Sequence, residues 1–136
     1  MSVSTKVIFF VSIWVLSSPS IFCQLRINEA VSSNTESFYD EQGDTPDWIE
    51  LYNAGSEAIS LANMFISDSP TNLFLGTLPD SLVQPGAYVL ILASDKALAD
   101  SIRTYIHVPF KLSSSDETIY LVNRDGSLRD YLIVPA

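Results

Sequence analysis

The residues best suited to chemistry lie in one acidic segment, Asp40 to Asp47, which reads Asp-Glu-Gln-Gly-Asp-Thr-Pro-Asp. Calcium takes roughly six to eight oxygen ligands, and aspartates closely spaced around a glycine can supply several of them. The spacing is not that of an EF-hand loop, because Gly43 follows Asp40 too closely. The segment predicts either a calcium site with Asp40, Asp44 and Asp47 or, more simply, a solvated loop whose Asp and Pro residues form the turn.

The stretch that follows this loop, Asp47 to Asn53, offers a second kind of site. Its side chains alternate, so Trp48, Glu50 and Tyr52 share one face of a strand while Ile49 and Leu51 share the other. Aromatic rings flanking a carboxylate can bind a glycan or a protein. The alternative is that a neighbouring loop covers the rings, since large aromatic side chains are usually mostly buried. The residues predicted to contact a partner are Trp48, Glu50, Tyr52, Asp40, Asp44 and Asp47.

No catalytic constellation emerges from the sequence. The chain has one histidine, His107, and a Ser-His-Asp site would have to use it, but nothing around it resembles a nucleophile elbow. Sixteen scattered acidic residues offer carboxylate pairs in any fold, so their number does not indicate a glycosidase. There is no Gly-rich phosphate loop. The sequence predicts a protein that is not an enzyme, with no cofactor other than the calcium considered above.

Composition narrows the class of partner and the compartment. The 136 residues suffice for one domain. The net charge is −9, and removing residues 1–23 takes away only Lys6, which leaves six basic and sixteen acidic residues and a net charge of −10. Nucleic acid is therefore excluded as a partner, because phosphate binding needs a basic surface. With a single cysteine, Cys23, the chain can form neither an internal disulfide nor a structural zinc site of Cys and His ligands.

The N-terminus reads as a signal peptide covering residues 1–23. Lys6 precedes an apolar run, Val7 to Leu16, which is too short to span a bilayer. Cleavage could follow Ser20 or Cys23. A buried strand of the domain is one alternative, and a lipoprotein leader with Cys23 acylated is another, although Phe22 is bulky for that signal. We expect a secreted or cell-surface protein with no membrane span once the signal is removed.

The rest of the chain, residues 24–136, reads as short strands separated by turns. Tyr88–Ala93 is a continuous apolar run, which predicts a central strand buried on both faces. Gln84-Pro85-Gly86 predicts a type II turn, and Asn123-Arg124-Asp125-Gly126 predicts a hairpin between 118–122 and 128–134. Residues 95–102 could form one or two helical turns. Further strands are expected at 25–31, 47–53, 59–61, 64–67, 73–75 and 82–83. This pattern predicts an all-β, immunoglobulin-like antiparallel β-sandwich without the Cys-Trp-Cys signature of antibody domains.

Several short motifs occur in a recognisable order. They are Ile27-Asn28-Glu29, Asp47-Trp48-Ile49-Glu50-Leu51-Tyr52-Asn53, Pro85-Gly86-x-Tyr88, Phe110-Lys111-Leu112-Ser113 and Asp125-Gly126. Together they resemble the lamin tail domain of secreted and cell-surface bacterial proteins, over nearly all of residues 24–136. The resemblance implies an immunoglobulin-like sandwich and a non-catalytic role in binding or attachment to a protein or glycan at the cell surface. It also implies an alternative, an accessory domain or fragment of a larger extracellular hydrolase or multidomain surface protein.

Overall fold

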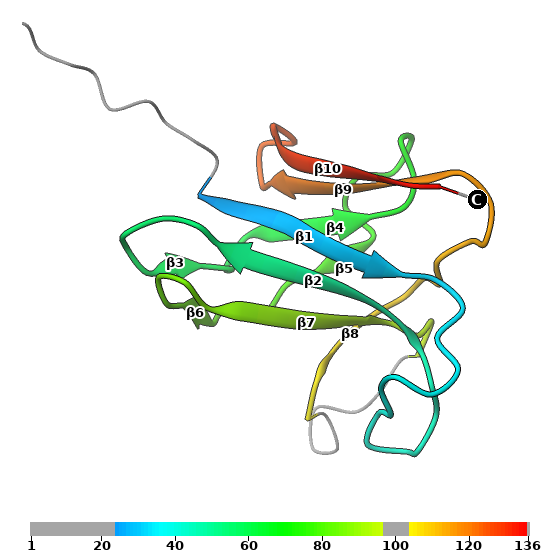
Figure 1. The fold of residues 1–136 in the computed structure, drawn as a ribbon. Coiled ribbons are helices and arrows are strands. Elements are labelled where there is room, and N and C mark those ends of the chain that lie inside the picture. Colours follow the sequence, from blue (N-terminus) through cyan, green and yellow to red (C-terminus); the bar gives the residue numbers. More distant parts are fainter. Residues whose placement is uncertain (1–23, 97–103, 136) are drawn as a thin grey trace, which may run out of the picture.

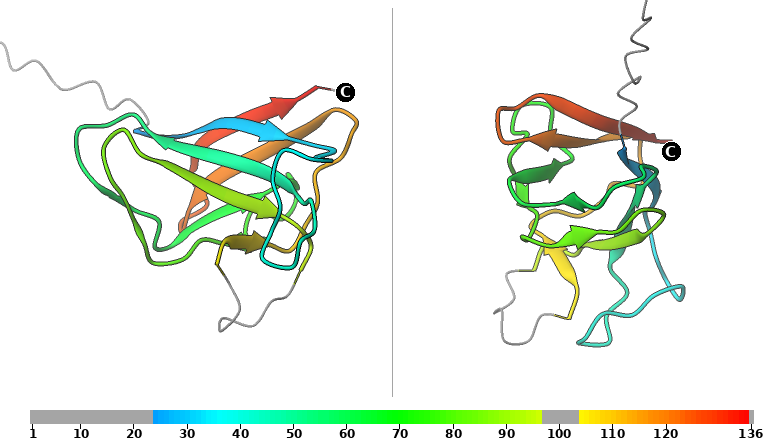
Figure 2. Two further views of the ribbon diagram at one scale, coloured as in Figure 1. Left: turned by 60° about the horizontal axis from the view of Figure 1, so that its bottom comes forward. Right: turned by 90° about the vertical axis from the view of Figure 1, so that its left-hand side faces the viewer.

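The computed structural model describes residues 24–96 and 104–135, which form two four-stranded sheets and one small sheet (Figures 1 and 2). The first sheet has the order β1 (Leu25–Val31), β2 (Asp47–Asn53), β7 (Tyr88–Ala93) and β8 (Ile106–Val108). The second has the order β10 (Leu128–Val134), β9 (Glu117–Asn123), β4 (Met64–Ser67) and β5 (Gly76–Thr77). The small sheet pairs β3 (Ile59–Ser60) with β6 (Leu82–Val83). The expected signal peptide lies outside the described residues.

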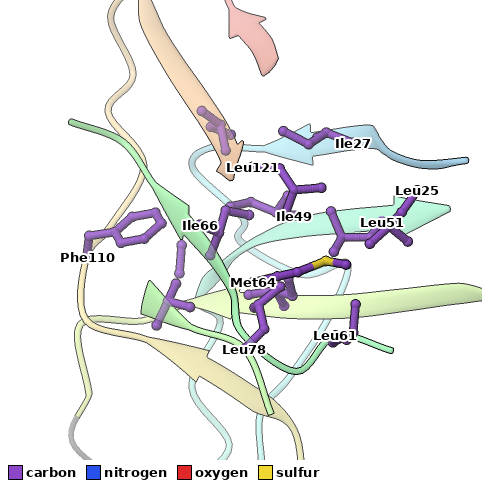
Figure 3. Close-up of a cluster of buried hydrophobic side chains, with 14 of the residues drawn as sticks. Leu25, Ile27, Ile49, Leu51, Leu61, Met64, Ile66, Leu78, Phe110 and Leu121 are labelled. Atoms are coloured by element: carbon purple, nitrogen blue, oxygen red, sulfur yellow. The ribbon is translucent and has the colours of Figure 1, made fainter. Parts of the chain in front are cut away.

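Alternation along the strands builds a single core between the two large sheets. On β2, Ile49 and Leu51 are fully buried, whereas Trp48, Glu50 and Tyr52 lie on the outer face. Ile66 of β4 and Leu121 of β9 meet them from the opposite sheet (Figure 3). This layered arrangement confirms the predicted immunoglobulin-like β-sandwich. No helix within the described residues is long and apolar enough to cross a membrane.

Specific contacts join the two sheets at their edges. β1 and β10 each contain a register shift, and just beside these bulges the Ile27 N–H donates to Asp130 Oδ2 over 2.8 Å. At the other edge, β5 lies against β8. A Cβ added to Gly76 would stand 2.8 Å from Val108 Cγ1, so the close approach of these strands depends on glycine.

The predicted turns are present. Gly86 has φ of 72°, and the Ala87 N–H donates to the Gln84 carbonyl over 3.0 Å, as a type II turn requires. Gly126 has φ of 79°, and its N–H donates to the Asn123 carbonyl over 2.9 Å at the end of the β9–β10 hairpin. Local turn chemistry therefore sets both of these connections.

Three expectations about individual strands need correction. Residues 73–75 are not a strand, because Phe74 instead packs edge-on against Phe65 with ring centroids 5.0 Å apart, and β5 begins at Gly76. β7 is central but not buried on both faces along its length, since Tyr88 is 57% exposed. The sandwich is also not wholly antiparallel: β8 pairs parallel with β7, and residues 94–105 supply the long connection that parallel strands need. The expected helical turns at 95–102 lie largely outside the described residues.

Candidate functional site

The outer face of the first sheet is divided into a covered half and an open half. In the covered half, the Trp48 indole N–H donates to Ser37 Oγ over 3.4 Å, in the loop of residues 32–46 between β1 and β2. Leu92, the β7 partner of Trp48, is fully buried although it faces outward. The loop therefore packs over this end of the sheet and leaves Trp48 half-buried.

In the open half, three side chains from adjacent strands form one row across the sheet. The register places Arg26 of β1 opposite Tyr52 of β2, and Tyr52 opposite Tyr88 of β7. The two tyrosine rings have centroids 4.6 Å apart and planes tilted by 30°, and the Arg26 guanidinium lies 5.2 Å from the Tyr52 centroid. The row therefore presents a cation and two aromatic rings together on the outer face of the sheet.

Carboxylates lie in the next row of the same open face. The Asn28 amide donates to Glu50 Oε1 over 2.8 Å, and Glu29 stands directly opposite Glu50 in the strand register. Two like charges placed opposite each other on a sheet are mildly destabilising. We call Arg26, Asn28, Glu50, Tyr52 and Tyr88 the tyrosine surface. Of the residues predicted to contact a partner, it brings together Glu50 and Tyr52.

The acidic loop is organised by Asp40, whose side chain is fully buried. Asp40 Oδ1 accepts the backbone N–H groups of Gln42 and Asp44, each over 2.9 Å. The Lys96 ammonium forms ion pairs with Asp40 Oδ2 and, over 2.6 Å, with Asp44 Oδ2. Burial alone would raise the pKa of Asp40, but the hydrogen bonds from Lys96, Asp44 and Gln42 together lower it. Lys96 thus supplies a positive charge between two of the predicted calcium ligands.

Asp47, the third predicted calcium ligand, has a different role at the start of β2. Its Oδ1 accepts the Asn34 N–H over 3.2 Å, and the Asn34 amide donates to the Phe38 and Pro46 carbonyls over 2.8 and 2.9 Å. Asp47 therefore helps to anchor loop 32–46. A cavity of about 390 Å³ lies alongside, lined by Asp44, Thr45, Pro46, Asp47, Ala93, Ser94, Lys96 and Lys111.

His107 is buried on β8 and joins that strand to loop 32–46. Its Nδ1 shares a hydrogen bond of 2.8 Å with Ser94 Oγ, and its Nε2 lies 3.0 Å from Glu41 Oε2. Glu41 Oε1 also accepts the Thr104 N–H over 3.1 Å. Asp40, Glu41 and His107 offer ligand atoms within 4.8 Å of one another. The sequence did not single out Glu41 or Ser94, because nothing local marks residues that meet only across the fold.

Two face-to-face sheets around one core, with polar and aromatic side chains on the outer face, define an immunoglobulin-like β-sandwich module. Residues 22–134 match the lamin tail domain family, and the chain belongs to that family. Among solved structures, it is similar to a chain of the archaellum periplasmic stator protein complex FlaF and FlaG from Sulfolobus acidocaldarius. The identity is 19%, the TM-score is 0.43, and the match covers 92% of this chain and 100% of that chain. No curated protein matches the sequence.

Proposed function

We propose that this lamin tail domain is a non-catalytic module that is secreted or held at the cell surface, where it binds a protein or glycan through the tyrosine surface. The observation that carries the proposal is the pair Tyr52 and Tyr88, whose rings stack on each other while Tyr88 remains 57% exposed. Exposed tyrosine combines apolar contact area with a hydroxyl group, which suits recognition of sugars and of protein surfaces.

The polar groups around the rings support the same role. Arg26 and Asn28 supply hydrogen-bond donors, and Glu50 supplies acceptors beside the stacked tyrosines. The β1–β2 and β2–β7 pairings of the first sheet hold these side chains on strands instead of on a loop. A surface fixed in this way loses little conformational entropy when a partner binds.

A non-catalytic role is supported by the environment of the histidine. Ser94, His107 and Glu41 form a continuous hydrogen-bonded line, but Ser94 is only 5% exposed and its Oγ accepts the Lys96 backbone N–H over 3.3 Å. A hydroxyl that already accepts a hydrogen bond and barely reaches solvent is poorly placed to attack a substrate. These hydrogen bonds are better explained as a structural connection between β8 and loop 32–46.

Binding to intact host cells and to a glycan array tests the proposed surface. We expect Tyr88→Ala and Tyr52→Ala to abolish binding of the labelled protein. The matched control is Tyr131→Ala, because Tyr131 is 55% exposed but lies on β10 of the opposite sheet. The proposed surface would be contradicted if Tyr52→Ala and Tyr88→Ala bound as well as the parent protein. It would also be contradicted if the Tyr131→Ala control lost as much binding as they did.

The location of the protein is tested separately by intact mass and cell fractionation in the native host. A soluble extracellular chain that begins near Ile21 or Gln24 is expected if the leader is a cleaved signal peptide. A lipid adduct on Cys23 would instead identify an anchored surface protein. An intracellular chain that retains Met1–Cys23 would contradict secretion.

A further inference from the structure

Loop 32–46 and β8 lie at the same end of the molecule (Figures 1 and 2), and they bring one imidazole and two carboxylates together. Asp40 and Glu41 come from the loop and His107 comes from β8. Their side chains are withdrawn from solvent, with exposed fractions of 0% for Asp40 and His107 and 13% for Glu41. Buried charges in proteins are usually paired or bound to a metal, and Lys96 already pairs with Asp40 in this cluster.

The spacing of the ligand atoms suits a first-row divalent ion. Bonds from zinc to nitrogen or oxygen are about 2.1 Å, so two ligands at the tetrahedral angle stand about 3.4 Å apart. His107 Nε2 and Glu41 Oε2 are separated by 3.0 Å. The three ligand atoms lie within 4.8 Å of one another, so the side chains would close by up to about 1.4 Å around a tetrahedral ion.

The far side of the imidazole is held by a hydrogen bond, as is usual for metal-binding histidines. Ser94 Oγ lies 2.8 Å from His107 Nδ1 and can accept a hydrogen bond from the Nδ1–H, which leaves the Nε2 lone pair facing the two carboxylates. Asp40 Oδ1 is occupied by two backbone N–H groups and Oδ2 accepts the Lys96 ammonium, so an ion would have to use the second lone pair of Oδ2 or displace Lys96.

The cluster also carries a net negative charge, which favours the binding of a divalent cation. Asp40, Glu41 and Asp44 contribute three negative charges, and Lys96 contributes one positive charge. With His107 neutral, as a ligand must be, two negative charges remain uncompensated. A divalent ion would neutralise them.

We propose that Asp40, Glu41 and His107 form a binding site for a divalent transition-metal ion of the zinc type. The imidazole ligand distinguishes this site from the calcium site that the acidic segment alone suggested, because calcium prefers oxygen ligands whereas zinc readily accepts imidazole nitrogen. Asp44 and Asp47 are not ligands of this ion. Its binding would tie loop 32–46 to β8 at the end of the sheet that the loop covers.

The test is calorimetric titration of Zn²⁺ into the tag-free full chain in a Cys23→Ser background, which removes the only thiol. We expect one zinc ion per chain, and a melting temperature that rises with zinc but not with equimolar calcium. His107→Gln and Glu41→Gln should each weaken zinc binding by about tenfold or more. Lys96→Met should strengthen it, because the competing ammonium on Asp40 is removed.

Glu36→Gln is the matched control, since Glu36 is an exposed glutamate of the same loop. It should bind zinc like the parent chain. Circular dichroism of each variant without metal separates lost ligands from lost folding. The proposal is overturned by the absence of stoichiometric zinc binding to the folded parent, or by unchanged affinity in both folded ligand variants.

Discussion

Tyr52 and Tyr88 stand directly opposite each other on β2 and β7, with their ring centroids 4.6 Å apart. Tyr52 is partly shielded by Arg26 on one side and by Tyr88 on the other, whereas Tyr88 is more than half exposed. Tyr52 therefore contributes mainly to packing on the sheet surface, whereas the ring of Tyr88 is accessible to a partner. The two contributions can be separated by mutation.

The coupling between the two rings is measurable by a double-mutant cycle. Aromatic pairs contribute about 0.5–1.5 kcal/mol beyond the area they bury. We expect Tyr52→Ala to destabilise the chain more than Tyr88→Ala, and the two losses to be non-additive by an amount in that range. Urea unfolding of the parent, the two single variants and the double variant gives the coupling. Additive losses would show that the rings are neighbours without a favourable interaction.

Part of this architecture could be read from local sequence and part could not. Alternation identifies Ile49 and Leu51 as core residues, and Gly126 marks its hairpin, because both signals depend on neighbouring residues. The contact between Lys96 and Asp40 joins residues 56 positions apart, and that between His107 and Glu41 joins residues 66 positions apart. No local pattern encodes such pairs. They depend on the parallel β7–β8 pairing and on the path of loop 32–46.

The exposure of Tyr88 could not be predicted from the local sequence for the same reason. It opens a continuous apolar run, so the sequence suggests that it is buried like the rest of β7. β8 pairs only with the second half of that strand, from Ile91 to Ala93, and leaves Tyr88 without a neighbouring strand on that side. The exposed position of Tyr88 follows from the length and register of another strand.

Asn53 at the end of β2 should be critical for stability. Its side chain is fully buried and donates to the Val83 and Glu57 carbonyls over 2.9 and 2.8 Å, while its Oδ1 accepts the Gly55 N–H over 2.9 Å. Asn53→Ala removes all three hydrogen bonds and leaves the buried Val83 carbonyl without this donor, which should cost about 2–4 kcal/mol. Asn72→Ala, at an exposed position, is the control and should cost less than about 0.5 kcal/mol. Chemical denaturation measures both, and similar losses would contradict the assigned role.

Gly76 on β5 should not tolerate a side chain. An added Cβ would lie 2.8 Å from Val108 Cγ1 and 3.0 Å from the Ile66 carbonyl oxygen. Because the second neighbour is backbone, Gly76→Ala should cost about 1–3 kcal/mol through overpacking. Val108→Ala should recover part of this loss when combined with Gly76→Ala, since it removes the nearer atom. Thermal unfolding of the single and double variants tests this. The absence of any recovery would place the strain at the Ile66 carbonyl.

Asp40 should make the stability of the chain sensitive to acid. Its pKa is lower in the folded chain because the hydrogen bonds from Lys96, Asp44 and Gln42 outweigh the opposing effect of burial. The stabilisation is therefore fully present above the unfolded pKa of about 3.9 and is lost as the pH falls through the lower folded value. Asp40→Asn keeps an oxygen for the backbone N–H groups but removes the charge that pairs with Lys96. It should cost about 1–2 kcal/mol at pH 7.

The matched variant is Asp44→Asn, because Asp44 also pairs with Lys96 but its side chain is 66% exposed. Its loss should stay below about 0.5 kcal/mol, as for most exposed ion pairs. Urea unfolding between pH 7 and pH 2.5 should show the difference between the parent and Asp40→Asn shrinking toward the acid end. A difference that stays constant over this range would mean that Asp40 stabilises the loop through the shape of its hydrogen bonds and not through its charge.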